Sequence, residues 1–577
     1  MNGAACRWVV NRTNPEFISY FSRIADLSPV LAQILVNRGI NTPALLAPFL
    51  KPGLAQLSDS FDLPGLNIAL GRIAEAKQRG ERVLVHGDYD ADGVTATAIM
   101  VEGLRSYGLD VHFFIPNRML HGYGFNHDGV RRAREIGASL IVTVDYGITS
   151  FDAVCDAGNH GIDVIITDHH EPAAPGEHAG ADGQPFVIPP ALSVVNPRLL
   201  AGESPLRLLS GAGVAFHLIY ALFKGDTDRT FHLLDLAALG TMADVVPVIA
   251  DNRVLVHEGM KLIGEGRRAG LRALKDVAGL RRDRMRSSDL AYVLVPRLNA
   301  AGRMDDATTV VELLLSVSEE KAAELAAWLN ALNVRRQEVE EKVYREAQEM
   351  MERLDDRAGA IVLASEGWHQ GVVGIVASRI AEEFYRPTFI LSVDNGVARG
   401  SGRSIPPFDL HDALIACRHV LAKFGGHRQA AGVSLDPCRV EEFRQMLSGI
   451  LAERVGQDDL SPVLRLDSVV KISDISRNFI REISMLEPFG HGNEEPLFGA
   501  RGLDVLNCRV VGNRHLKMYL KQDGWSIDGI AFNMGDRAGD LGGRARIDAA
   551  FCPAIHTWDG KEYLQLQVKA IRPSAER

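Results

Sequence analysis

Side chains that commonly bind divalent metals are concentrated at a few places in the sequence. Asp88, Asp90 and Asp92 stand within five residues, and the run Asp168-His169-His170 combines a carboxylate with two imidazoles. Three adjacent carboxylates repel one another unless a cation neutralises them. Carboxylates with imidazole suit Mn²⁺, Mg²⁺ or Zn²⁺, and the excess of oxygen ligands favours the first two. The sequence therefore predicts a site for Mn²⁺ or Mg²⁺.

Two further aspartates are candidates for the same site. Asp145 directly follows the apolar run SLIVTV, and Asp244 interrupts the apolar stretch LAALGTMADVVPV. The sequence leaves open whether Asp244 caps a helix or binds a metal, and Asp88 has the alternative of a turn residue that caps a helix. Two metal ions that share a carboxylate would activate water and hold a phosphoryl oxygen. The expected chemistry is phosphoester hydrolysis.

The elements around these residues have the pattern of a parallel sheet. Short apolar runs alternate with helical stretches, which is typical of right-handed βαβ units. The strands are expected at 82–86, 111–116, 139–144 and 163–167. Ligands of such sheets bind outside the carboxyl ends of the strands. Asp88 to Asp92, Asn117-Arg118, Asp145 and Asp168 to His170 each follow one strand, so we expect them at one edge.

Length and composition restrict the class of protein. A chain of 577 residues exceeds one hydrophobic core and predicts several domains. No apolar run reaches the roughly 18–20 residues of a membrane span, and the amino terminus lacks the pattern of a secretory signal. The six cysteines form no C-x-x-C pair, which fits a reducing cytoplasm. The net charge of −10 disfavours nucleic-acid binding, but local basic groups can override this sum.

Beyond the first sheet the pattern predicts a helix and two more folded parts. We expect an auxiliary helical region over 1–75, the first α/β domain over 76–317 and a connecting helix over 318–355. A second, smaller α/β lobe over 356–457 precedes short β runs over 462–577 that suggest a barrel. The glycines of GAGVAF (211–216) do not form a dinucleotide fingerprint and are expected to allow close helix packing.

The combined motifs resemble a known family. HGDYDADG, TVDYG, TDHH and GTMADVVP, followed by PRLNAAGRM, WHQGVVGIVASR, GSGRS and KFGGH, are similar to the DHH/DHHA1 phosphoesterases and, within them, the RecJ exonucleases. The resemblance runs in order from about residue 28 to the end. It implies a DHH lobe, a DHHA1 lobe and an OB-fold barrel. It also implies a 5′→3′ exonuclease that degrades single-stranded DNA to 5′-mononucleotides with two Mn²⁺ or Mg²⁺ ions, in DNA repair and recombination.

The resemblance also implies roles for individual residues. The family's metal ligands fall on Asp90, Asp92, Asp145, His169 and Asp244, and His86 matches a ligand in the pyrophosphatase branch. His170, with Asp168, matches the position beside the scissile phosphate. The positions that hold the 5′ end, the adjacent backbone and the substrate motif of the second lobe are Arg118, Tyr123, Arg303, Ser401, Arg403, Gly426 and His427. A single-strand-binding protein and a helicase are the implied partners.

Two other functions stay open at this point. A phosphodiesterase for short oligoribonucleotides or cyclic dinucleotides would use the same metal cluster but would not need the barrel over 462–577. A DNA-binding scaffold without activity would keep the fold and lose the ligands, yet every matched ligand position is intact.

Overall fold

The computed structural model describes residues 6–11, 13–117, 124–173, 186–281, 284–353, 359–512, 514–541, 545–558 and 561–574. The chain forms two compact units. The central unit consists of 47–336 and 486–494, and the flanking unit consists of 1–46, 337–485 and 495–577. Each unit is described by itself.

A five-stranded parallel sheet lies in the central unit. Its strands, in chain order, are β2 (Arg82–Gly87), β3 (Asp110–Phe114), β4 (Leu140–Val144), β5 (Asp163–Thr167) and β6 (Ser193–Val195). Their spatial order is β3-β2-β4-β5-β6, and all neighbours are parallel. The four predicted strands and their parallel arrangement are confirmed. The sequence analysis did not find β6.

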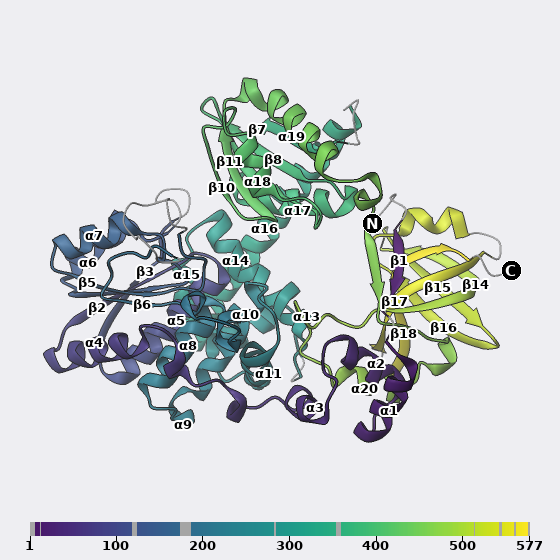
Figure 1. The fold of residues 1–577 in the computed structure, drawn as a ribbon, viewed down its shortest axis with the longest axis horizontal. Coiled ribbons are helices and arrows are strands. Elements are labelled where there is room, and N and C mark those ends of the chain that lie inside the picture. Colours follow the sequence, from purple (N-terminus) through teal and green to yellow (C-terminus); the bar gives the residue numbers. More distant parts are fainter. Residues whose placement is uncertain are drawn as a thin grey trace. The chain divides into compact units, whose positions relative to one another are not determined.

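Helices cover both faces of this sheet (Figure 1). Leu84 and Ile141 pack in one core with residues of α6 (His127–Ile136) and α7 (Phe151–Asn159). Val83 and Val142 point to the other face and share a core with α4 (Leu66–Arg79) and α5 (Ala91–Tyr107). Because both faces are covered, the strands are apolar throughout rather than alternating. The carboxyl ends of the strands are left to carry the polar residues.

The remainder of the central unit is helical. Its helices are α8 (Gly211–Leu222), α9 (Thr227–Thr230), α10 (Leu234–Ala243), α11 (Ala250–Glu265), α12 (Ala269–Val277), α13 (Ser287–Asp289), α14 (Val295–Met304) and α15 (Thr308–Leu315). Helices α5, α8 and α10 pack together and are buried along most of their length. This explains why their sequences are apolar on every side.

A long helix, α16 (Glu319–Glu352), continues into the flanking unit and confirms the predicted connecting helix. There a second sheet has the order β10-β11-β9-β8-β7. Its strands are β7 (Ile361–Glu366), β8 (Thr388–Asp394), β9 (Val397–Arg403), β10 (Lys423–Gly426) and β11 (Ala430–Leu435), accompanied by α17 (Gln370–Phe384), α18 (Leu410–Ala416) and α19 (Val440–Arg454).

The carboxyl-terminal part is the predicted barrel. Strands β14 (Phe498–Val511), β15 (His515–Gln522), β16 (Trp525–Ala531), β17 (Arg546–Trp558) and β18 (Lys561–Pro573) pair in the order β14-β15-β16-β18-β17. An additional pairing of β14 with β17 closes the barrel. The short strands β12 (Val463–Leu466) and β13 (Ser468–Val469) and the helix α20 (Arg477–Ser484) precede it.

The amino-terminal segment is tied to the entry of the barrel. Strand β1 (Arg7–Val10) pairs in parallel with β12, and helices α1 (Pro15–Ala25), α2 (Pro29–Asn37) and α3 (Pro43–Leu50) follow. The side chain of Ser28 caps α2 by accepting from the Leu31 N–H, and Pro29 occupies the first position of the helix. Within the described ranges, no helix has both the length and the apolar character that crossing a membrane requires.

Candidate metal centre

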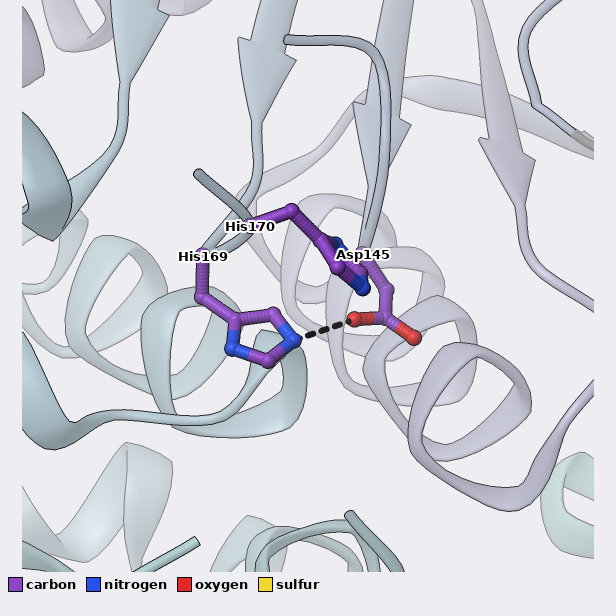
Figure 2. Close-up of side chains that lie close together, drawn as sticks. All are labelled: Asp145, His169 and His170. Atoms are coloured by element: carbon purple, nitrogen blue, oxygen red, sulfur yellow. Dashed lines mark ion pairs between the residues drawn. The ribbon is translucent and has the colours of Figure 1, made fainter. Parts of the chain in front are cut away.

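A histidine at the end of β5 lies among three carboxylates. The Nε2 atom of His169 is 3.1 Å from Asp145 Oδ1, 3.5 Å from Asp244 Oδ2 and 3.9 Å from Asp92 Oδ2. Figure 2 shows that the side chains of His169 and Asp145 point toward one another. These residues come from β5, β4, α10 and α5, so elements far apart in sequence deliver them to one place.

The start of α5 fixes Asp90 and Asp92. Asp90 is the N-cap of the helix, and its Oδ1 accepts hydrogen bonds from the N–H groups of Asp92 and Gly93, both at 3.0 Å. The N–H of Ala91 donates to Asn299 Oδ1 of α14 at 2.8 Å. The helix end therefore uses one oxygen of Asp90, and the other oxygen remains for a ligand.

Asp145 follows β4 in a backbone conformation that non-glycine residues rarely adopt. Its φ is 67°, in the left-handed region. The N–H of Asp145 donates to Thr167 O of β5 at 3.0 Å, and the neighbouring Tyr146 hydroxyl donates to Gly87 O at 2.9 Å. These bonds to the two adjacent strands hold the turn. A strained residue that the surroundings fix in this way is common at functional sites.

Asp168 belongs to the same loop as His169, but its carboxylate does not join the cluster of proposed ligands. Its Oδ1 accepts from the N–H groups of His169 at 2.7 Å and His170 at 3.0 Å, and it lies 2.7 Å from His170 Nδ1. Its Oδ2 accepts from the Ile148 N–H at 2.9 Å. Both oxygens are thus engaged inside the protein. The carboxylate orients the His170 ring.

Burial and mutual repulsion determine the charges of the cluster. Burial, followed by the charges of neighbouring aspartates, raises the pKa of Asp92 to about 6, that of Asp244 to about 8 and that of Asp145 well above its ordinary value. Burial and the positive charge of His170 lower the pKa of His169 to about 3. His169 is therefore a neutral imidazole, the form that binds metals. Without a cation, the carboxylates bind protons instead.

His170 carries the opposite charge state. Burial lowers its pKa, but the hydrogen bond to Asp168 and the charges of Asp168, Asp244 and Asp88 outweigh this and raise it to about 9. The ring is an imidazolium at neutral pH. One of its nitrogens lies within 4.8 Å of ligand atoms of Asp145 and His169. A positive charge therefore stands at the edge of the cluster.

The donor set fits a pair of divalent metal ions. Asp145 Oδ1 and both ring nitrogens of His169 are buried without a hydrogen-bond partner in the described part of the chain. Such atoms cost roughly 1–3 kcal/mol each and call for a ligand. Among the described residues, three groups have ligand atoms within 4.8 Å of one another: Asp145-His169-His170, Asp92-His169-Asp244 and Asp88-Asp90-Asp145. The five ligands implied by the resemblance all occur in these groups, and Asp88 joins them.

The first domain has four other predicted site residues. His86 is fully buried, with its ring edge-on to Phe114, Phe125 and Tyr146 at centroid distances of 5.1–5.2 Å, and it occurs in none of the three ligand groups of the described residues. Arg118 and Tyr123 lie outside the described residues. Arg303 is on α14, next to Gly302, which packs against Tyr89 O.

The candidates of the second lobe belong to two strands of its sheet. Ser401 and Arg403 are on β9, and both side chains approach Gly374 of α17. Strand β11 pairs with β9 on one side and with β10 on the other. Gly426 ends β10 with a φ of 139°, and the His427 N–H donates to Ala430 O at 2.8 Å. The flanking unit thus carries Ser401 and Arg403 on β9, and Gly426 with the following His427 at the end of β10, on the two strands that flank β11.

The sequence analysis missed two residues that hold the histidine loop. Asn196 Nδ2 donates to His170 O at 3.0 Å, and Arg198 Nε donates to His169 O at 3.1 Å. Both follow the short strand β6. The signal was present as SVVNPR, an apolar run that ends in a polar residue, like the other four strands.

Comparisons with known proteins identify the family. Family models match residues 82–241 (DHH family, N-terminal domain), 357–453 (DHHA1 domain) and 466–570 (RecJ OB domain). The single-stranded-DNA-specific exonuclease RecJ of Bacillus subtilis is 36% identical over 99% of this chain and 71% of its own length. The protein of that name from Escherichia coli is 36% identical over 95% and 96%.

Solved structures of relatives match the fold of this chain, and two of them contain Mn²⁺ or Mg²⁺. RecJ from Thermus thermophilus in complex with Mn²⁺ matches with a TM-score of 0.82 and 33% identity, covering 99% of this chain and 80% of that one. The same protein in complex with Mg²⁺ matches with a TM-score of 0.76 and 31% identity, covering 99% and 79%. The sequence, the fold and the order of the matched domains agree, and the chain belongs to the RecJ family of DHH phosphoesterases.

Proposed function

We propose that this exonuclease hydrolyses single-stranded DNA from the 5′ end and releases 5′-mononucleotides, with Mn²⁺ or Mg²⁺ held by Asp90, Asp92, Asp145, His169 and Asp244. One observation carries the proposal. Buried carboxylate and imidazole atoms, several without a protein partner among the described residues, converge within 4.8 Å at the carboxyl edge of the parallel sheet. Family membership gives the class of reaction, a metal-dependent cleavage of single-stranded DNA.

The chain's own residues supply orientation and charge for this reaction. Two divalent ions at the cluster would lower the pKa of a water molecule and neutralise charge on the phosphoryl oxygens. His170, protonated and oriented by Asp168, stands beside the cluster. Its positive charge would stabilise the phosphoryl group as the water attacks phosphorus and the bond to the 3′-oxygen breaks. Its proton is available to the departing oxygen.

Specificity for one strand is assigned to other parts of the chain. We propose that the second lobe over 356–457 holds the strand through Ser401, Arg403, Gly426 and His427, and that the barrel over 462–577 grips it. Exposed aromatic side chains on the barrel, among them Tyr519, Trp525 and Phe532, are suited to stack on bases. Arg118, Tyr123 and Arg303 are proposed to hold the 5′ end of the strand.

The expected partners follow from the substrate. An enzyme restricted to single strands needs duplex DNA to be opened, so we propose that it works with a helicase and a single-strand-binding protein in DNA repair and recombination. All six cysteines are free thiols. This is compatible with a reducing compartment, and we propose the cytoplasm.

Labelled strands test the polarity and the substrate length. The purified chain is incubated with Mn²⁺ and long single strands labelled at either the 5′ or the 3′ end, with dinucleotides in parallel. Early release of labelled mononucleotide from the 5′ end supports the proposal, and early release from the 3′ end contradicts it. Cleavage of dinucleotides alone would favour a short-substrate phosphodiesterase.

A variant tests the metal site. Asp145→Ala is expected to abolish turnover while the affinity for a single strand, measured in EDTA by fluorescence anisotropy, stays close to that of the wild type. Retained turnover would remove Asp145 from the site.

A further inference from the structure

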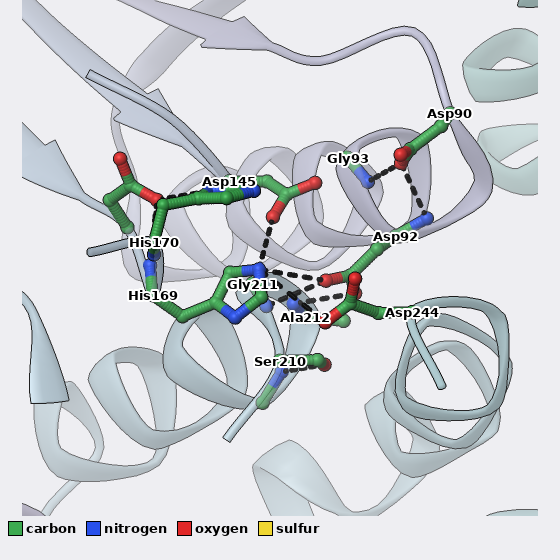
Figure 3. Close-up of polar contacts among 12 residues, drawn as sticks. Asp90, Asp92, Gly93, Asp145, His169, His170, Ser210, Gly211, Ala212 and Asp244 are labelled. Carbon is green, nitrogen blue, oxygen red and sulfur yellow. Dashed lines mark hydrogen bonds and ion pairs between the residues drawn. The ribbon is translucent and has the colours of Figure 1, made fainter. Parts of the chain in front are cut away.

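The amino end of α8 contacts two of the proposed metal ligands. The N–H of Gly211 donates to Asp92 Oδ2 at 2.7 Å, and the N–H of Ala212 donates to Asp92 Oδ1 at 2.9 Å. Figure 3 shows the carboxylate of Asp92 facing these two backbone groups. The Ser210 side chain accepts from the Gly213 N–H at 3.2 Å and caps the helix. One N–H therefore occupies each oxygen of Asp92.

Two backbone donors do more for Asp92 than a single bond would. They fix the plane of the carboxylate, because rotation about its last torsion would break both bonds. Each oxygen keeps a second lone pair for a cation. The partial positive charge of the helix end also offsets one of the several negative charges gathered here.

Gly211 is in contact with the second ligand, Asp145. A Cβ atom at position 211 would lie 2.4 Å from Asp145 Oδ1 and 2.6 Å from Asp145 Cβ. The Oδ1 atom is one of the buried ligand atoms that have no hydrogen-bond partner in the described part of the chain. The backbone of Asp145 cannot move away easily, because its N–H is bonded to Thr167 O at 3.0 Å. Any side chain at 211 therefore pushes on a ligand oxygen.

The same helix end is closed from a third side by α10. A Cβ atom on Gly240 would lie 2.4 Å from Ala212 Cβ and 2.5 Å from Asp92 Oδ1. Asp244 is the C-cap of this helix, one turn further on. The backbone of α8 thus lies against Asp92 and Asp145, and it packs against the helix that presents Asp244.

The two glycines of the GAGVAF segment have different surroundings. Gly213 meets only apolar side chains, with its Cβ position 3.0 Å from Leu209 Cδ2 and 3.6 Å from Leu255 Cδ1. Its role is the close helix packing that the sequence analysis expected. Gly211 alone faces a ligand, which makes Gly213 a matched control on the same helix.

We infer that the amino end of α8 is a positioning element for the metal centre, in which Gly211 admits the backbone donors to Asp92 and leaves room for Asp145. This inference rests on the proposed metal site. Restoring an ordinary contact of 3.4 Å from the 2.4 Å distance at Gly211→Ala requires a shift of 1.0 Å. Metal sites tolerate only about 0.2 Å in their ligand distances, so the variant should bind metal poorly.

Metal binding is the readout that separates positioning from general packing. Full-length Gly211→Ala and Gly213→Ala are compared with the wild type and with Asp145→Ala. The Mn²⁺ affinity is measured by the electron paramagnetic resonance signal of free Mn²⁺, and melting temperature and strand affinity are measured in EDTA. We expect a Kd for Mn²⁺ about 10–100-fold higher for Gly211→Ala, as for other groups that orient metal ligands. Gly213→Ala should bind Mn²⁺ within about twofold of the wild type.

The outcomes separate this inference from the proposed function. A wild-type Mn²⁺ affinity in folded Gly211→Ala overturns the positioning role, and so does an equal loss in both glycine variants. If Asp145→Ala binds Mn²⁺ as well as the wild type, the metal site itself is wrong.

A second substitution removes the donor without adding bulk. If Gly211→Ala does not fold, the amide of Ala212 is replaced by an ester, which lacks the N–H that donates to Asp92 Oδ1. A several-fold weaker Mn²⁺ affinity supports the inference, and an unchanged affinity overturns it.

Discussion

Binding of Mn²⁺ to the metal-free protein is expected to release at least about one proton at pH 7. Burial, followed by neighbouring carboxylates, raises the pKa of Asp244 to about 8, that of Asp92 to about 6 and that of Asp145 well above its ordinary value. At pH 7 the protonated fractions are about 0.9 for Asp244 and about 0.1 for Asp92, so these two carboxyls together hold about one proton, and the raised pKa of Asp145 can only add to this number. A metal needs the ionised ligands, so these protons must leave.

Calorimetry in two buffers measures this number directly. Mn²⁺ is titrated into metal-free protein in PIPES and in Tris, which take up protons with different enthalpies, and the difference in binding heat gives the protons released. In Asp244→Asn the release should fall by about one, because that site then holds no exchangeable proton. Equal heats in both buffers would show that the carboxylates are already ionised and would refute the reasoning.

The same pKa values determine how stability depends on pH. Between about pH 4, the ordinary carboxyl value, and pH 8, the folded metal-free protein holds a proton on Asp244 that the unfolded chain has lost. The free energy of unfolding in EDTA should therefore fall as the pH rises through this window, by about 1.4 kcal/mol per pH unit for each such proton. Saturating Mn²⁺ should remove this dependence, which thermal melts at several pH values can measure.

Three other substitutions test separate parts of the structure. Asp168→Asn removes the charge that holds the proton on His170, so the pKa of His170 should fall from about 9 toward its ordinary value and kcat should drop about tenfold. Histidine NMR measures the pKa and a pH–rate profile measures the effect on kcat. An unchanged pH–rate profile would contradict the role of Asp168. Gly426→Ala places a Cβ 2.4 Å from the carbonyl oxygen of Ala430 on β11 and should weaken binding of single-stranded DNA several-fold. In Gly425→Ala the added Cβ meets nothing within 4 Å, so this variant is the control. Burial raises the pKa of Asp251, but hydrogen bonds from a histidine and a serine outweigh this and lower it below its ordinary value. The ionised carboxylate therefore stabilises the folded protein, and this contribution should be lost as the pH falls below about 4. The free energy of unfolding of Asp251→Asn, measured by calorimetry, should fall less over the same pH range.

The architecture around the metal centre could be predicted because burial leaves a clear pattern. Strands covered by helices on both faces must be apolar along their whole length, so each polar residue after a strand is conspicuous. Asp145 and the Asp168-His169-His170 run were found in this way. Strand β6 has only three residues, so the same pattern in SVVNPR is much shorter, and Asn196 and Arg198 were missed with it.

The orientation of side chains could not be predicted from the same pattern. Asp145 and Asp168 both follow an apolar strand, but the positive φ at Asp145 directs its carboxylate to His169. Asp168 instead turns back to three donors of its own loop and to the Ile148 N–H of the loop after β4. Asp244 was left open between a cap and a ligand. It is the C-cap residue of α10 and also lies 3.5 Å from His169, so the two roles do not exclude each other.

The glycines beside the cluster show why residue type alone does not reveal every residue that a metal site depends on. Donors stabilise carboxylates that are buried together, but side-chain donors such as lysine would compete with the metal for the same oxygens. Backbone N–H groups at a helix end supply donors without a full charge, provided that no side chain separates them from the ligand. Gly211 meets this condition, and the cost of burying Asp92 beside Asp145 is offset by a residue that has no chemistry of its own. A search confined to acids, bases and nucleophiles would find the ligands and miss what holds them.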